Sequence, residues 1–330
     1  MSQPTSIADR SGAEDHSASV PAEMHGWRLD QAAARLFPSF SRARLQAWID
    51  EGRLRCNGAP VARRRDPVTE GDTLELSPVE EPDTRVRPQA LDFDVLYEDD
   101  DLAIVNKPAG LTVHPGAGAA DGTLQNALLH RFPKSDRVPR AGIVHRLDKD
   151  TSGLLVVALS VAAHTQLVRM LQAREIRREY DAVVSGRVTA GSTVDAPIGR
   201  DPQHRTRMAV AHDGRDSVTH FRVEKRFAAH TWLRVRLETG RTHQIRVHMK
   251  HLNHPIVGDA TYGGRQIRGP GLAPAVREAL ASFPRQALHA RLLQLQHPLN
   301  GSEVMIEAPL PADMAALVQV LAAESPDRGD

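Results

Sequence analysis

The sequence predicts a chain of two domains that contain both helices and strands. Its 330 residues exceed the size at which a single hydrophobic core usually stops growing. Residues 28–76 show two helical patterns followed by strand-like segments, and from residue 90 onward short apolar strands alternate with amphipathic helices. Residues 79–89 between them are rich in Pro, Glu, Asp and Arg, which indicates an interdomain linker. We therefore expect domains at residues 22–78 and 90–325.

The composition places the chain in a reducing compartment. Residues 1–21 are rich in Ser, Ala and acidic residues and lack an apolar core, so we expect a disordered tail rather than a secretory signal, with a second tail at 326–330. No apolar run approaches the roughly 20 residues of a membrane span. The single cysteine, Cys56, excludes an internal disulfide and a thiolate metal cluster. These features predict a cytoplasmic protein that does not associate with a membrane.

The first domain should consist of two helices and a small sheet. Leu29, Ala32 and Ala33 share one helical face. A second helix is expected from Arg42 to Glu51, because Ser41 is a favourable N-cap residue. Alternating residues at 53–56, an Asn-Gly turn signal and the apolar pattern at 73–76 predict strands.

Arginines are concentrated in this domain, although the formal net charge of the whole chain is only +1. Residues 28–65 contain nine arginines and three acidic residues, an excess of six positive charges. Such a patch indicates a phosphate-binding surface. A solvated, merely soluble helical face is the alternative, but acids are scarce and the arginines recur in both helices and strands. The RNA-binding candidates here are Arg42, Arg44, Arg53 and Arg55.

A charged loop followed by a buried strand marks the second domain. Residues 145–151 hold two carboxylates, Asp148 and Asp150, and two cations, Arg146 and Lys149, and the apolar run 154–158 indicates a buried strand. Rigid scaffolds commonly present catalytic groups on such loops. By spacing alone, a solvated turn with mutual ion pairs explains these residues equally well.

Residues 145–155 resemble the signature of the RluA family of pseudouridine synthases, within the RluD type that modifies large-subunit ribosomal RNA: His-Arg-Leu-Asp-Lys-Asp-Thr-Ser-Gly-Leu-Leu. The similarity extends from about Arg28 to about Leu317. It implies that Asp148 is the catalytic residue, that Arg241 pairs with it, and that Tyr180 stacks on the target uracil. Residues 22–78 similarly resemble an S4-type RNA-binding domain.

The resemblance also implies RNA contacts in the second domain. Arg146 corresponds to the residue that fills the space vacated by the target base, and His145, beside it, is a second RNA-binding candidate. Lys107 either contacts a phosphate or is an ordinary exposed lysine. Arg205 lies in a basic segment similar to one that contacts RNA, for which a surface loop is the alternative.

The fold implied by the family is α+β, with a mostly antiparallel, mixed, twisted sheet around a central cleft, and the strand pattern is compatible with it. Isomerising a uridine to pseudouridine needs no cofactor and no metal. The sequence has no phosphate-cradling glycine loop or dinucleotide fingerprint. The histidines at 243, 248, 251 and 254 lack a carboxylate or cysteine at a known ligand spacing, so we expect no metal site.

The expected partner is large-subunit ribosomal RNA or a pre-ribosomal particle, bound by a monomer, with the target uridines in a stem-loop near the subunit interface. Two alternatives remain open at this point. One is a family relative that acts on transfer RNA, and the other is a non-catalytic ribosome-assembly factor that uses the arginine patch.

Overall fold

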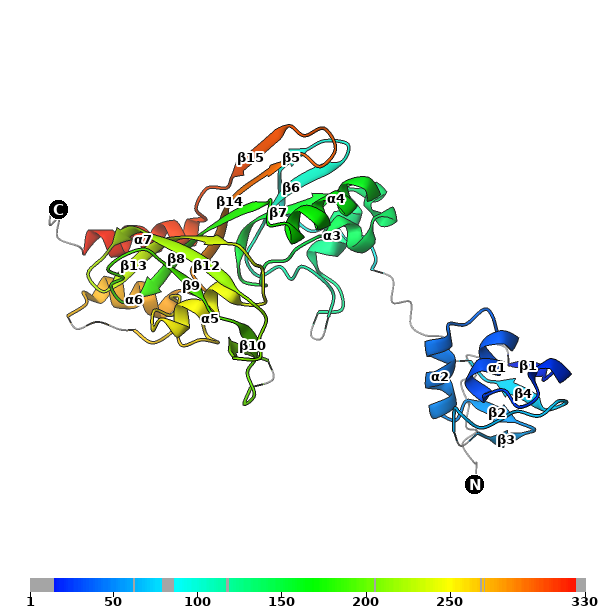
Figure 1. The fold of residues 1–330 in the computed structure, drawn as a ribbon. Coiled ribbons are helices and arrows are strands. Elements are labelled where there is room, and N and C mark those ends of the chain that lie inside the picture. Colours follow the sequence, from blue (N-terminus) through cyan, green and yellow to red (C-terminus); the bar gives the residue numbers. More distant parts are fainter. Residues whose placement is uncertain are drawn as a thin grey trace, which may run out of the picture. The chain divides into compact units, whose positions relative to one another are not determined.

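The computed structural model describes residues 15–61, 63–78, 86–116, 119–204, 206–267, 269 and 271–324. The chain divides into two compact units, residues 1–85 and 86–330 (Figure 1). Arg205, one of the expected RNA contacts, lies outside the described residues.

The first unit contains two helices and a four-stranded antiparallel sheet. The helices are α1 (Leu29–Leu36) and α2 (Arg42–Asp50), preceded by the short 3₁₀ helix η1 (Ala22–Met24). The strands, in sheet order, are β1 (His16–Ser19), β4 (Thr73–Leu76), β2 (Leu54–Cys56) and β3 (Ala59–Pro60). Strand β1 pairs with β4, so the expectation of a tail reaching residue 21 is wrong for these residues.

Local signals explain the boundaries of this unit. The Ser41 hydroxyl accepts a hydrogen bond from the backbone N–H of Arg44, so α2 begins where the cap residue predicts. Leu45, Trp48 and Ile49 of α2 are buried against the sheet and α1. The turn at Asn57 has positive φ, as the Asn-Gly pair indicates.

The second unit is built on a nine-stranded sheet. Its path is β5 (Asp94–Glu98), β6 (Leu102–Lys107), β7 (Ser152–Ala158), β14 (Leu288–Gln296), β8 (Arg177–Ser185), β13 (His230–Leu237), β12 (Val218–Arg226) and β9 (Ser192–Asp195). β15 (Glu303–Glu307) pairs with β14, and β10 (Ile198–Arg200) forms a separate hairpin with β11 (Met208–Val210). Only β7 and β14 pair in parallel, which confirms the mixed, mostly antiparallel sheet.

Helices cover both faces of this sheet (Figure 1). The helices of this unit are α3 (Leu124–Arg131), α4 (Val161–Gln172), α5 (Gln244–His251), α6 (Pro274–Ser282) and α7 (Ala312–Ala323), with 3₁₀ helices η2 (Pro133–Arg137) and η3 (Pro139–Gly142). Every residue of β7 is buried, since it lies between two apolar layers. This explains why the run at 154–158 is continuously apolar.

The parallel contact between β7 and β14 fixes the start of β7. Gly153 has φ of +114° and pairs with Ala290. A Cβ atom at Gly153 would lie 2.2 Å from the Ala290 carbonyl oxygen, so only glycine allows this approach. The loop that carries Asp148 ends immediately before this contact, which places its carboxyl-terminal end on the centre of the sheet.

Candidate active site

A buried lysine, Lys107, binds the backbone of the loop between η3 and β7. Lys107 is fully buried, and its Nζ donates to the carbonyl oxygens of Pro108, Leu111 and Lys149 at 2.8–2.9 Å. Three carbonyls match the three hydrogens of an ammonium group. Burial lowers the Lys107 pKa to about 7, while Asp150 and Asp148 favour the charged form. Lys107 is therefore neither an exposed lysine nor a phosphate ligand, and the expectation of an RNA contact is corrected.

The other end of the loop is fixed by residues near the start of β14. Arg285 donates to the Asp150 carbonyl oxygen at 3.2 Å and forms two hydrogen bonds with the Asp313 carboxylate, at 2.6 and 2.8 Å. The Gln286 amide donates to the Thr151 hydroxyl at 3.1 Å. Since backbone and side-chain atoms of the loop are both bonded, the position of Asp148 is well defined.

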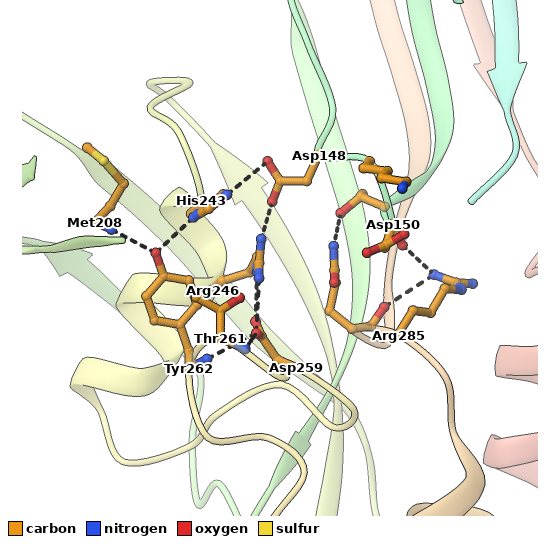
Figure 2. A network of polar contacts seen from close by, with 12 residues as sticks. Asp148, Asp150, Met208, His243, Arg246, Asp259, Thr261, Tyr262 and Arg285 are labelled. Carbon is orange, nitrogen blue, oxygen red and sulfur yellow. Dashed lines mark hydrogen bonds and ion pairs between the residues drawn. The ribbon is translucent and has the colours of Figure 1, made fainter. Parts of the chain in front are cut away.

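Asp148 forms its ion pair with Arg246 of α5. Nη1 of Arg246 lies 2.9 Å from Asp148 Oδ2, and the other side of the guanidinium donates to both oxygens of Asp259 at 2.7 and 3.0 Å (Figure 2). Asp259 is fully buried and also accepts from the backbone N–H groups of Thr261 and Tyr262. Burial opposes the charge of Arg246, but its bonds to Asp259 and Asp148 raise its pKa, so it stays protonated.

The expected pairing of Asp148 with Arg241 is therefore corrected. Arg241 precedes α5 and lines the same cavity, but its Nε donates to the Asp216 carbonyl oxygen at 3.1 Å. Its backbone N–H donates to the side chain of Gln244, which is fixed in turn by Thr239 and Thr219. The Arg241 side chain is thus bonded to the Asp216 backbone, whereas Arg246, inside the helix, bonds the loop through Asp148.

His243 contacts the same network. It occupies the N-cap of α5 in a left-handed conformation, with φ of 58°. Its Nδ1 lies 2.8 Å from the Tyr262 hydroxyl, and its Nε2 lies 3.9 Å from Asp148 Oδ1 (Figure 2). The Tyr262 oxygen also accepts a hydrogen bond from the Met208 N–H at 2.9 Å, which fixes the position of the ring beside His243. Burial lowers the His243 pKa, with the Asp148 charge opposing that shift.

Asp148, His243 and Arg246 border a cavity of about 610 Å³, within the size range of sites for small organic groups such as a nucleoside. Asp148 and Tyr180 both line it, so the structure brings these two predicted residues together. Tyr180 is 5% exposed, and burial raises its pKa, a shift opposed by Arg178 and increased by Asp148. Arg146 is exposed at the same cavity.

His145 lines this cavity too, but one ring nitrogen is engaged in the fold. Nε2 accepts a hydrogen bond from the backbone N–H of Val156 at 3.1 Å. Burial, assisted by the charge of Arg178, lowers the His145 pKa to about 3. His145 is therefore a neutral acceptor that ties the loop to β7.

The arginines of the first unit occupy several environments. Arg42 and Arg28 both bind Asp30, which is fully buried at the start of α1. Arg44 lies over the Trp48 ring at 5.5 Å, and Arg53 pairs with Glu51. Arg55 is exposed on β2. All four predicted residues thus belong to one compact unit.

The described residues contain neither a candidate metal cluster nor a membrane-spanning helix. No group of three or more His, Cys, Asp or Glu side chains is placed to hold a metal ion there. His248, for example, is buried and bonded to Thr219 and to the Ala196 carbonyl oxygen. In the same residues, no helix has the length and apolar character needed to span a membrane.

Comparison with known proteins identifies the family. Residues 101–251 match the RNA pseudouridylate synthase family, and residues 27–74 match the S4 domain. The chain is 51% identical over 313 residues to ribosomal large subunit pseudouridine synthase D of Escherichia coli K12, covering 95% of this chain and 96% of the relative. It is 53% identical over 304 residues to the protein of the same name from Pseudomonas aeruginosa, covering 92% and 95%.

Two solved structures have a fold similar to that of this chain. Human RNA pseudouridylate synthase domain containing 4 superposes with a TM-score of 0.55 at 24% identity, covering 69% of this chain and 92% of that one. Human RNA pseudouridylate synthase domain containing 1 gives a TM-score of 0.52 at 28% identity, covering 76% and 100%. The chain therefore belongs to the RNA pseudouridylate synthase family and carries an S4 domain at residues 27–74.

Proposed function

We propose that this enzyme isomerises specific uridines of large-subunit ribosomal RNA to pseudouridine. The observation that carries the proposal is one carboxylate, Asp148, which is ion-paired to a protonated arginine and opens onto a nucleoside-sized cavity beside Tyr180. The relatives that match nearly the whole chain are named for the large ribosomal subunit, which supports this substrate over transfer RNA.

Asp148 supplies the charge that the reaction needs. The bond between uracil N1 and ribose C1′ must break, C5 must bond to C1′, and the proton lost from C5 is balanced by one gained at N1. Arg246 occupies Asp148 Oδ2, so Oδ1 is the oxygen that attacks C1′ or removes the proton at C2′. The carboxylate lies in a partly buried site, where its side chain is 18% exposed and the Arg246 guanidinium supplies the opposite charge.

Tyr180 and Arg241 are assigned to the target base and its surroundings. Stacking of uracil on the Tyr180 ring contributes about 1–3 kcal/mol. Arg241 borders the cavity without pairing to Asp148, so we assign it to contacts with the RNA. Its catalytic effect then arises through substrate placement.

The target nucleotide must leave its stack to enter the cavity, at a cost of a few kcal/mol. Exposed Arg146 at the cavity mouth would occupy the vacated space, with His145 supporting the loop behind it. Bases in loops are already partly unstacked, which favours a stem-loop target. The first unit, through Arg42, Arg44, Arg53 and Arg55, would bind flanking RNA phosphates.

The partner in this proposal is ribosomal RNA or a pre-ribosomal particle, met in the cytoplasm by a monomer. Mapping pseudouridines in ribosomal and transfer RNA of a deletion strain tests the substrate. We expect specific sites to vanish from large-subunit RNA and to return with the wild-type gene. Loss of sites in transfer RNA alone would contradict the proposed substrate.

A further inference from the structure

The side chain of one buried arginine of the active-site cavity has no hydrogen-bond or ion-pair partner among the described residues. Arg178, on β8, is 8% exposed and lines the cavity together with Asp148 and Tyr180. Within the part of the chain that the structure describes, its side chain forms no ion pair, and its Nε has no hydrogen-bond partner. A buried charge in this state is unfavourable unless something else compensates it.

The other buried arginines of this unit are compensated. Arg246, at 6% exposed, is bound by Asp148 and Asp259, and Arg285, at 7%, by Asp313. The half-buried Arg234 is paired with Asp181. Arg178 therefore differs from these arginines because no carboxylate pairs with it. Burial does not account for the difference, since Arg246 and Arg285 are buried to a similar extent and are paired.

Strand alternation directs Arg178 toward the cavity. Arg177 and Glu179 lie on one face of β8, where their side chains pair at 2.5 Å. Arg178 lies on the opposite face with Tyr180, because successive side chains of a strand alternate. The backbone at Gly240 approaches the guanidinium so closely that a Cβ there would lie 3.0 Å from Nη1. The Gly240 backbone thus lies against the guanidinium group of Arg178.

The carboxylates around the cavity are already engaged. Asp148 is bound by Arg246, and Glu238 is bound by Arg174 and His220. Neither neutralises Arg178, so the missing counter-charge must come from the ligand. A uracil carbonyl is neutral, whereas a phosphate carries the charge and accepts two parallel hydrogen bonds from a guanidinium.

We propose that Arg178 binds a backbone phosphate of the RNA beside the target nucleotide, forming a preformed anion subsite within the cavity. The nature of the ligand rests on the function proposed above, whereas the requirement for an anion rests on Arg178 itself. The subsite would fix the swung-out nucleotide from its sugar–phosphate side while Tyr180 holds the base.

The test compares Arg178→Met with Arg177→Met, the same substitution on the other face of the same strand. Both are made in an Asp148→Asn background so that RNA is bound without turnover. We expect Arg178→Met to weaken binding of an RNA stem-loop by about 30-fold or more and to lower the salt slope by about one. Arg177→Met should change affinity less than about threefold, since its partner is internal.

Two further measurements separate this role from a structural one. Without RNA, Arg178→Met should leave the Tm unchanged or raise it, because it removes an uncompensated buried charge. Single methylphosphonate substitutions along the RNA should reveal one linkage whose neutralisation weakens the parent protein but not Arg178→Met. A fall in Tm with unchanged RNA affinity would overturn the proposal, as would the absence of any such linkage.

This design also separates the two proposals. If the wild-type protein fails to isomerise the RNA but the methylphosphonate effect still depends on Arg178, the proposed function fails and the anion subsite stands. If the RNA is isomerised but affinity is insensitive to Arg178, the subsite fails alone.

Discussion

Arg246 binds Asp259 through two hydrogen bonds, at 2.7 and 3.0 Å, and this leaves its Nη1 directed at Asp148. The fully buried carboxylate fixes the plane of the guanidinium, so the arginine reaches the loop without adjustment. An active site gains from charges that are oriented before the substrate arrives. The pair Arg246–Asp259 thus prepares Asp148 for reaction.

Arg246→Lys tests this orientation. A lysine keeps the charge but cannot bond two carboxylates with a planar fork, so we expect kcat to fall about 100-fold. Arg241→Lys is the comparison, and its loss should be smaller and appear mainly in KM. Single-turnover rates with an RNA stem-loop measure both. An equal loss of kcat in the two variants would argue against the assignment of Arg246 as the partner of Asp148.

Lys107→Met tests a purely internal role. The change leaves the Pro108 and Leu111 carbonyls without this donor, while the Lys149 carbonyl keeps its bond from the Gly110 N–H, so we expect the free energy of unfolding to fall by about 2 kcal/mol or more. Exposed Lys134→Met is the control. RNA affinity of the folded Lys107→Met protein should stay within about threefold of wild type. A large loss of affinity without loss of stability would restore Lys107 as an RNA contact.

Gly153→Ala tests the contact between β7 and β14. The new Cβ would clash with the Ala290 carbonyl, and the positive φ adds strain, so we expect destabilisation above about 1 kcal/mol and reduced activity. Gly301→Ala has a positive φ as well but open space around the new Cβ. Chemical denaturation compares the two. Equal losses of stability in the two variants would mean that the close approach of Gly153 to Ala290 does not require a glycine.

The lowered pKa of His145 predicts that the free energy of unfolding depends on pH. Its pKa is about 3 in the folded chain, below its ordinary value of 6.5, so between these values the unfolded chain binds a proton that the folded chain does not. The free energy of unfolding should therefore fall as the pH drops from about 6.5 toward 3. His145→Gln, whose amide oxygen still accepts from Val156, should flatten this slope. Denaturant titrations at several pH values give the free energy of unfolding of both proteins. The same dependence on pH in wild type and His145→Gln would contradict the lowered pKa of His145.

Local patterns predicted the elements that depend on few neighbours. The Ser41 cap set the start of α2, and the apolar run at 154–158 identified β7. Strand β1 was missed because its short polar sequence is stabilised by pairing with β4, which the local composition does not reveal.

The site was predictable in part. The resemblance indicated Asp148 and Tyr180, which share the cavity. Arg246 was missed because its role depends on bonds to Asp259, in the loop after α5, and because Arg241 binds the Asp216 backbone instead. Lys107 was misassigned because burial by tertiary packing is invisible in a basic motif. The helical position of Arg246, three residues before buried Met249 and so on the same face, was a signal that could have found it.

The most direct test of the account is the rate at which purified Asp148→Asn isomerises a ribosomal RNA stem-loop, measured by release of the proton at uracil C5. The substitution keeps the size of the side chain and removes its charge. We predict no detectable isomerisation, with RNA affinity and Tm close to those of wild type. Turnover within tenfold of wild type by the folded variant would contradict the central role of the Asp148 carboxylate.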